Sequence, residues 1–186
     1  MTMPAVVKFD IEGPLQITPA RFGDTRGYFA EVYNKEVFRG LGVTSDFVQD
    51  NHSLSIDRGV LRGLHFQISP FAQAKLVRVV HGAIFDVAVD IRGGSPTYGR
   101  SVTAMLSAEN GHQLFVPAGF AHGFCTLEAA TEVLYKVDAQ YSREHERGLL
   151  WNDPALAIPW PIDPDSALLI DRDNTFPLLS GLPRYF

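Results

Sequence analysis

Turn-forming residues interrupt this sequence at short intervals and leave little room for long helices. Glycine occurs 16 times and proline 12 times in 186 residues, and clusters at 57–59 and 93–96 separate short apolar segments. The clearest of these segments, residues 83–91, has apolar side chains on one face and Asp86 and Asp90 among those on the other. Such alternation is typical of a half-buried strand. Many short strands favour an all-β sandwich or barrel.

Other parts of the chain fit the same architecture. Strands are expected at residues 47–51, 60–67, 75–80, 101–106, 113–116 and 132–137. One short helix is expected over residues 35–41, with Asn34 as its N-cap and Gly42 as its stop. Beyond Trp151, four prolines favour irregular chain that wraps around the rest. We therefore expect a single domain over residues 1–186, built as a jelly-roll-like β-barrel with short peripheral helices.

Composition excludes several classes of partner. The net charge of −5 gives no bulk attraction to nucleic acid or to an anionic membrane. No apolar run approaches the roughly 20 residues of a membrane helix, and charge interrupts the N-terminal segment too early for a secretory signal. Cys125 is the only cysteine, which suits a reducing compartment. We expect a cytoplasmic protein without nucleic-acid or membrane partners.

Two segments have the spacing of the cupin motifs. Residues 111–122 run from a glycine through five residues to P-x-G-x-x-H, which ends at His122 and aims that histidine into the barrel. Residues 59–67 match the start of the first motif, but Gln67 stands where metal-binding cupins have a second histidine. Glutamine is a poor ligand for transition metals. The sequence therefore predicts a barrel without a bound metal.

A more specific resemblance covers nearly the whole chain. It is carried by residues 22–27, 47–53, 61–67, 75–78, 85–92, 107–110, 119–124, 134–136 and 151–153. In these segments the chain resembles the dTDP-4-dehydrorhamnose 3,5-epimerase family of the cupin superfamily. The resemblance implies a dTDP-linked 4-keto-6-deoxy sugar as substrate and an isomerase that needs no cofactor. The ketone acidifies the protons on both neighbouring carbons, so inversion needs a base on one face of the ring and an acid on the other.

The resemblance also implies the catalytic residues. His65 matches the family base, and an imidazole ordinarily titrates near pH 6.5, so it can accept a proton near neutrality. Asp173 matches the carboxylate that orients this histidine, although Asp171 is close enough to be an alternative. Tyr135 matches the acid, and Lys75 fits a cation beside the developing enolate oxygen. Asp86 could also support the catalytic histidine.

A second group of residues matches positions that bind substrate in the family. Arginine suits pyrophosphate because its planar fork can pair with two phosphate oxygens. Phe22 could stack on the base, and Arg172 stands where the family often has lysine. The group consists of Phe22, Arg26, Glu31, Gln49, Asn51, Arg62, His122, Glu146 and Arg172. The family usually forms a homodimer whose N-terminal region reaches the partner's sheet, which would place Phe22, Arg26 and Glu31 at the neighbouring site.

Other interpretations stay open at this point. His65 and Tyr135 could be core residues of strands, and Arg26 and Arg62 could form ordinary surface ion pairs. A relative that inverts only C3 or only C5 would use the same base and similar contacts. A metal-dependent cupin oxygenase is disfavoured by Gln67, and a sugar-binding barrel without catalysis would have no activity to lose when His65 is replaced.

Overall fold

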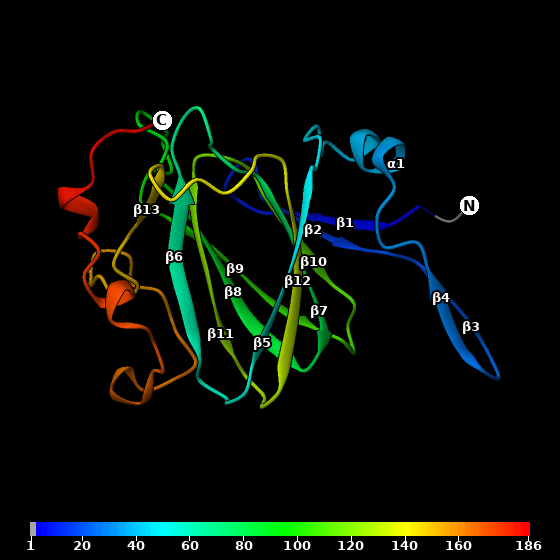
Figure 1. The fold of residues 1–186 in the computed structure, drawn as a ribbon. Coiled ribbons are helices and arrows are strands. Elements are labelled where there is room, and N and C mark those ends of the chain that lie inside the picture. Colours follow the sequence, from blue (N-terminus) through cyan, green and yellow to red (C-terminus); the bar gives the residue numbers. More distant parts are fainter. Residues whose placement is uncertain (1–2) are drawn as a thin grey trace.

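Two antiparallel β-sheets pack face to face (Figure 1). The computed structural model describes residues 3–186. The first sheet has the order β1 (Ala5–Lys8), β2 (Leu15–Thr18), β10 (Gln113–Val116), β7 (Lys75–His81), β12 (Thr131–Val137) and β5 (Gln49–Ser55). The second has the order β13 (Glu146–Gly148), β6 (Leu61–Gln67), β11 (Phe120–Thr126), β8 (Ala83–Asp90) and β9 (Ser101–Ser107). The all-β jelly roll is confirmed, and within the described residues it is an open sandwich because no strand ladder joins the two sheets.

Strand β8 shows how the core is organised. Ile84 and Ala88 point between the sheets and pack with apolar residues of β7, β10 and β11. Val87 and Val89 point the other way and are also fully buried. The expectation of a half-buried strand was therefore wrong: the second face is covered by the C-terminal chain. The polar residues of the inner face, Asp86 and Asp90, are buried with it.

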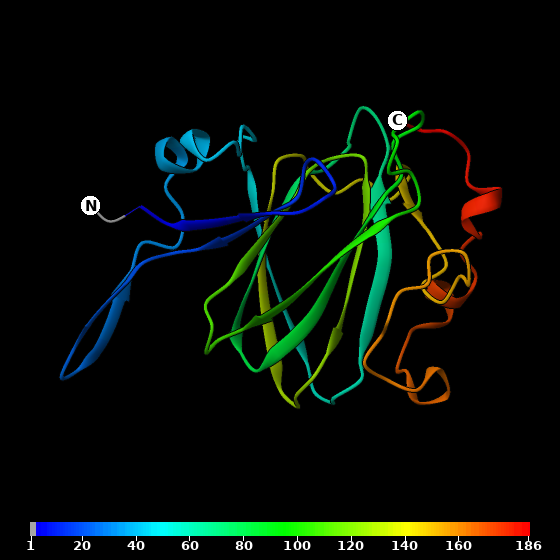
Figure 2. The same cartoon turned by 180° about the vertical axis from the view of Figure 1, so that it is seen from behind.

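The C-terminal chain covers the outer face of the five-stranded sheet, as expected from its prolines. Apart from an isolated bridge between Val60 and Leu168, residues 151–186 form turns and three short 3₁₀ helices, η1 (Pro164–Ser166), η2 (Asp171–Asn174) and η3 (Leu179–Gly181). This segment, orange to red in Figures 1 and 2, lies alongside β6 and β13. Its apolar side chains complete a core cluster with Val87 and Val89. The cover places η2 against the middle of β6, where Asp173 contacts Gly63 and His65.

The one α-helix among residues 3–186 follows the sequence signals. Helix α1 (Lys35–Gly40) begins after Asn34, whose side chain accepts hydrogen bonds from the amides of Glu36 and Val37. Gly42 adopts a positive φ of 101°, which ends the helix at a residue without a Cβ clash. Phe38 buries the inner side of the helix in a cluster on the outer face of the six-stranded sheet. Among the described residues, no helix is long and apolar enough to cross a membrane.

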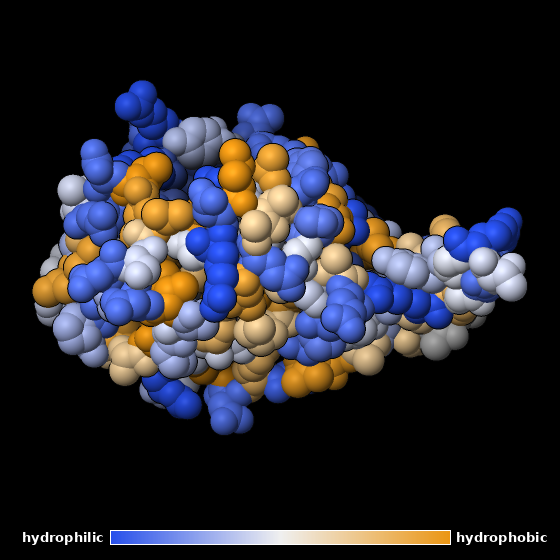
Figure 3. Space-filling model, turned by 90° about the horizontal axis from the view of Figure 1, so that it is seen from below, coloured by the Kyte–Doolittle hydropathy of each residue, from blue (hydrophilic) through white to orange (hydrophobic). Residues whose placement is uncertain are grey.

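A hairpin that the sequence did not predict projects from the body. Strands β3 (Arg21–Asp24) and β4 (Gly27–Ala30) pair only with each other among the described residues. Figures 1 to 3 show the hairpin as an arm on one side of the molecule. It leaves Phe22, Tyr28 and Phe29 at least 49% exposed. Large aromatic side chains on a projecting arm are typical of a surface that contacts another molecule.

Several strand boundaries also differ from expectation. The strand expected at 47–51 is β5, which continues to Ser55, and β1, β2, β11 and β13 were not predicted. Strand β11 is buried along its whole length. A strand buried on both faces has no alternation to detect, and a strand of three or four residues gives too short a pattern.

Candidate active site

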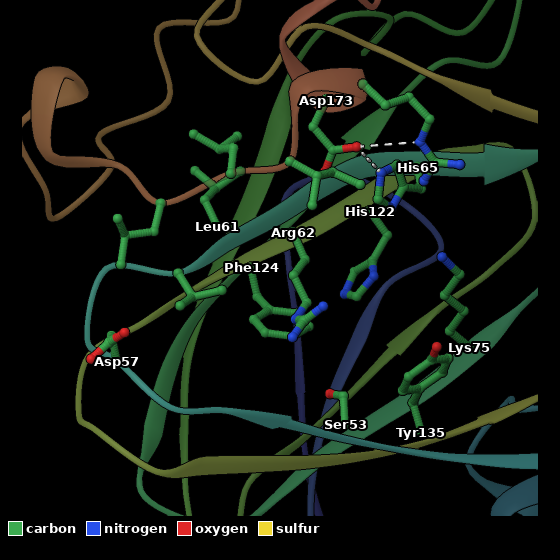
Figure 4. A pocket seen from close by; sticks show the side chains of 15 residues that line it. Ser53, Asp57, Leu61, Arg62, His65, Lys75, His122, Phe124, Tyr135 and Asp173 are labelled. Atoms are coloured by element: carbon green, nitrogen blue, oxygen red, sulfur yellow. Dashed lines mark hydrogen bonds and ion pairs between the residues drawn. The ribbon is translucent and has the colours of Figure 1, made fainter.

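A cavity of about 520 Å³ lies between the two sheets (Figure 4). One wall comes from β6 and β11, the opposite wall from β5, β7 and β12, and the rim from the chain that leads into η2. The lining consists of Ser53, Asp57, Val60, Leu61, Arg62, His65, Lys75, His122, Phe124, Tyr135, Leu168, Leu169, Ile170, Arg172 and Asp173. All four residues expected to be catalytic are present, together with three of the expected binding residues.

His65 is paired with Asp173. The side chain of His65, on β6, keeps 23% of its surface exposed, and its Nε2 lies 2.8 Å from Oδ1 of Asp173. The other carboxylate oxygen accepts a hydrogen bond of 3.2 Å from the Gly63 amide. The short turn η2 points Asp173 inward, whereas Asp171 is exposed and makes no contact with His65. Of the two candidate carboxylates, Asp173 is therefore the partner.

The environment of Asp173 keeps it ionised. Burial alone would raise its pKa, but the hydrogen bond from His65, the nearby imidazole charge and the Gly63 amide together hold the pKa below its ordinary value. An ionised carboxylate can only accept, so Nε2 of His65 carries the shared proton and Nδ1 is the basic nitrogen. The pair thus fixes the tautomer of His65.

Tyr135 and Lys75 come from the opposite sheet. Their strands, β12 and β7, are neighbours, and both side chains point into the cavity across from His65 (Figure 4). Burial raises the pKa of Tyr135, partly opposed by the charge of Arg62, so the phenol keeps its proton at neutral pH. Burial lowers the pKa of Lys75 to about 8, against the opposing effect of Asp86 and Glu146. Lys75 is still mostly cationic at neutral pH.

His122 belongs to a second histidine–aspartate pair. It lies on β11 directly opposite His65 on β6, and its Nε2 is 2.7 Å from Oδ1 of Asp86 on β8. The two side chains are 8% and 0% exposed. The expectation that Asp86 could support the catalytic histidine was wrong. Asp86, on β8, instead pairs with His122 on the adjacent strand β11.

Arg62 and Arg172 stand at the rim. The guanidinium of Arg62 donates to the Ser55 hydroxyl and to the Leu54 carbonyl, both at 3.3 Å, so it is held against β5. Arg172 pairs with Glu146, with one nitrogen 2.6 Å from Oε2. Glu146 also accepts a hydrogen bond of 2.9 Å from the Tyr141 hydroxyl. Glu146 does not itself line the cavity, but it fixes Arg172 at its edge.

The remaining five expected binding residues lie outside this cavity. Gln49 and Asn51 are on the inner face of β5, four and two residues before Ser53, and Gln49 donates to Asn51 at 2.8 Å. Phe22 and Arg26 lie on the projecting hairpin and Glu31 just after it. Arg26 pairs there with Asp24. The chain does not bring Phe22, Arg26 and Glu31 to its own cavity.

Gln67 has a structural role in this chain. It is 4% exposed, and its amide nitrogen donates to the carbonyls of Phe71 and Gln140, while its oxygen accepts from the Ser142 amide at 2.6 Å. The side chain therefore ties two loops together. Across residues 3–186, no group of three His, Cys, Asp or Glu side chains has the geometry to hold a metal ion.

Sequence reasoning missed several lining residues. Ser53 and the apolar rim residues Leu168, Leu169 and Ile170 were not singled out. Ser53 continues the inward-facing series of Gln49 and Asn51 by alternation along β5, a signal that the predicted strand lost by ending at residue 51. The rim residues carried no signal, since only the wrapping of the C-terminal chain brings them to the cavity.

The arrangement can move protons on two sides of a bound molecule. A histidine with a fixed tautomer enters from one sheet, and a protonated phenol enters from the other, with a lysine beside it. A carbon acid held between them could lose a proton on one face and gain one on the other. Cationic Lys75 could stabilise the enolate between these steps, and the arginines at the rim suit an anionic group.

Comparison with known proteins gives a consistent result. A family model described as dTDP-4-dehydrorhamnose 3,5-epimerase matches residues 8–181. The dTDP-4-dehydrorhamnose 3,5-epimerase of Sinorhizobium fredii is 57% identical over 170 residues, which are 91% of this chain and 87% of the relative. The solved dTDP-6-deoxy-D-glucose-3,5-epimerase of Legionella pneumophila, in complex with dTDP-4-keto-L-rhamnose, is 43% identical, with a TM-score of 0.92 over 97% of this chain and 95% of that one.

A relative with a narrower activity is also similar. The 3'-monoepimerase of Streptomyces bikiniensis, solved in complex with dTDP-quinovose, is 36% identical, with a TM-score of 0.85 over 92% of this chain and 86% of that one. The general fold is thus shared by enzymes that differ in the number of carbons they invert. The family model and the relative from Sinorhizobium fredii each match most of the chain. The chain belongs to the dTDP-4-dehydrorhamnose 3,5-epimerase family.

Proposed function

We propose that this chain inverts C3 and C5 of dTDP-4-dehydro-6-deoxy-D-glucose and so forms dTDP-4-dehydro-L-rhamnose. The observation that carries the proposal is the pair of proton-transfer groups on opposite walls of one cavity, His65 with Asp173 on one and Tyr135 on the other. The complex of the Legionella relative with dTDP-4-keto-L-rhamnose supports the choice of sugar.

His65 is the base for both carbons. In the gluco configuration the hydrogens on C3 and C5 lie on the same face of the ring, so one base can reach both in turn. Nδ1 accepts each proton, and Asp173 stabilises the imidazolium that forms. The exposed part of the imidazole gives the transferred proton a route to solvent between the two steps.

Tyr135 returns a proton from the opposite face, which inverts each centre. Its raised pKa keeps the phenol in the acid form needed for this step. Lys75 stabilises the negative charge on the C4 oxygen of the enolate, where a fixed cation in a partly dry site has the largest effect. His122, held by Asp86, lies on the same cavity floor and contacts the sugar.

Arg62 and Arg172 bind the pyrophosphate and nucleoside side of the substrate. Both guanidinium groups are anchored, Arg62 by Ser55 and Arg172 by Glu146, so less side-chain entropy is lost on binding. Gln49 and Asn51 extend the polar wall along β5 toward the same ligand.

The working unit is a homodimer in which each hairpin completes the other protomer's site. Strand β5 is an edge strand, paired only with β12 among the described residues, and an open edge can accept a further strand. The β3–β4 hairpin projects from the body with its aromatic side chains exposed. Docking of one hairpin beside the other protomer's β5 would bring Phe22, Arg26 and Glu31 next to Gln49 and Asn51.

A monoepimerase is the second candidate, favoured by the likeness to the Streptomyces bikiniensis enzyme. The test is incubation with dTDP-4-dehydro-6-deoxy-D-glucose in heavy water, with deuterium counted by mass spectrometry and located by NMR. The 3,5-epimerase incorporates two deuterons above the no-enzyme control and inverts both carbons. A single deuteron identifies a monoepimerase, and no exchange with a substrate that binds contradicts catalysis.

A further inference from the structure

Ser53 has a buried hydroxyl that no other described residue satisfies. Its Oγ is buried and has no hydrogen-bond partner within residues 3–186, and Ser53 is one of the residues that line the cavity. A buried hydroxyl that loses water without gaining a partner destabilises a folded protein. Because Ser53 lines the ligand cavity, a rotation of its side chain about χ1 would present this hydroxyl to a bound molecule.

The place of Ser53 on β5 narrows the choice of partner. Asn51, Ser53 and Ser55 share the inner face of the strand. Asn51 is the cross-strand partner of Tyr135, and Ser55 accepts the hydrogen bond from Arg62. Ser53 therefore stands between these two groups, about 6 to 7 Å along the strand from each neighbour. Figure 4 shows Ser53 in this position, between Arg62 and Tyr135.

This inference rests on the proposed function. The substrate of that reaction carries its groups in the same order as Arg62, Ser53 and Tyr135 follow one another along the cavity wall. Arg62 faces the pyrophosphate on C1, and Tyr135 serves C3 and C5. The ring carbon between C1 and C3 is C2, which carries a hydroxyl that does not react. The other ring hydroxyl, on C3, changes its orientation during the reaction and cannot keep one fixed partner.

We propose that the Ser53 hydroxyl binds the C2 hydroxyl of the sugar and holds the ring in place through both inversions. A hydroxyl can donate or accept, so it matches a neutral sugar hydroxyl, whereas the neighbouring guanidinium matches phosphate. Ser53 is thus a specificity-determining residue for the hexose, separate from the groups that bind dTDP.

The test crosses one variant with one substrate analogue. Wild type and Ser53→Ala are compared by kcat/KM on the native substrate and on its 2-deoxy analogue. A lost neutral hydrogen bond reduces kcat/KM by about five- to tenfold, so wild type is expected to lose that factor on the analogue and Ser53→Ala on the native substrate. Ser53→Ala assayed on the 2-deoxy analogue should lose no more kcat/KM than either change alone, because both changes remove the same contact. Affinity for dTDP alone should be unchanged.

Ser55→Ala is the matched control, because it removes the hydroxyl that holds Arg62. It should lower kcat/KM by the same factor on both substrates and weaken dTDP binding. The melting temperature of Ser53→Ala should not fall, since its hydroxyl has no partner to lose. Independent, multiplying losses from Ser53→Ala and the 2-deoxy analogue would overturn the contact while leaving the epimerase intact. If wild type failed to turn over the native substrate, the proposed function itself would fail.

Discussion

Two histidine–aspartate pairs face the same cavity with almost equal hydrogen bonds, 2.8 Å in His65–Asp173 and 2.7 Å in His122–Asp86, yet they are built differently. His122 and Asp86 come from adjacent strands of one sheet and are both buried. His65 is partly exposed, and its aspartate comes from the C-terminal chain, more than 100 residues away in sequence.

The two pairs differ in exposure and in the origin of the aspartate, and this difference suits different roles in the proposed reaction. A proton acceptor needs a fixed tautomer and also a route by which the proton leaves, and the exposed edge of His65 provides one. A group that only contacts the substrate needs rigidity, which two neighbouring strands supply. In the proposed function, two pairs of similar geometry therefore serve different roles, and exposure separates the proposed base from the proposed binding residue.

Removing each imidazole gives the largest contrast. His65→Ala should lower kcat by about 10³-fold or more, because general-base catalysis of this kind contributes about 10²- to 10⁴-fold and His122, the other imidazole of that wall, is held by Asp86 and binds substrate in the proposed function. His122→Ala should lower kcat/KM by only about 10- to 100-fold, since it removes a contact and not the base. Steady-state kinetics on purified variants checks both values. Equal losses would contradict the division of roles.

Removing each carboxylate is expected to have smaller but still unequal effects. Asp173→Asn leaves a side chain of the same shape that no longer fixes the tautomer of His65, and kcat should fall by about 10²- to 10³-fold. Asp86→Asn should reduce kcat/KM by about tenfold, because in the proposed function His122 binds substrate and does not act as the base. A larger loss from Asp86→Asn than from Asp173→Asn would reverse the assignment.

Stability should respond to pH through Asp173. Its pKa in the folded protein is lowered, so its ionised form stabilises the fold fully above about pH 4, the ordinary range of the unfolded carboxyl, and this contribution is lost as pH falls through the folded-state pKa. The difference in melting temperature between wild type and Asp173→Asn should therefore be largest at neutral pH and narrow on acidification. A difference that grows toward low pH would contradict the lowered pKa.

The smallest effect is expected from the pH dependence of Lys75, which lines the wall opposite the two histidines. Its pKa is about 8, so the cation is lost as pH rises, and kcat/KM should fall about tenfold at one pH unit above that value. Lys75→Arg keeps its charge and should show a lower but flat rate over the same range. An unchanged alkaline limb in Lys75→Arg would assign the decline to another group.

The sequence predicted the sheet architecture better than the pairing of the site residues. Alternation identified β8, and the Asn34 cap and Gly42 identified α1, because both signals are local. Alternation places Asp86 on an inner face, but it does not reveal that β11 is the neighbouring strand, so the His122 partner was missed.

Other features of the fold and of the site could not be predicted from the local sequence pattern. Strand β11 is buried on both faces, and the β3–β4 hairpin is exposed on both, so neither shows the contrast between faces that marks a strand. Family resemblance named His65, Tyr135 and Asp173, whereas the unpaired hydroxyl of Ser53 depends on atomic packing that no motif encodes.

Deuterium exchange in Tyr135→Phe tests most directly whether base and acid act from opposite walls. In heavy water this variant should still exchange the protons next to the ketone, because His65 removes a proton, exchanges it with solvent and returns a deuteron on the same face, but it should no longer invert the carbons. NMR of the recovered substrate would then show deuterium with the gluco configuration retained. Inversion at the wild-type rate, or loss of exchange together with inversion in a folded variant that binds substrate, would contradict the account.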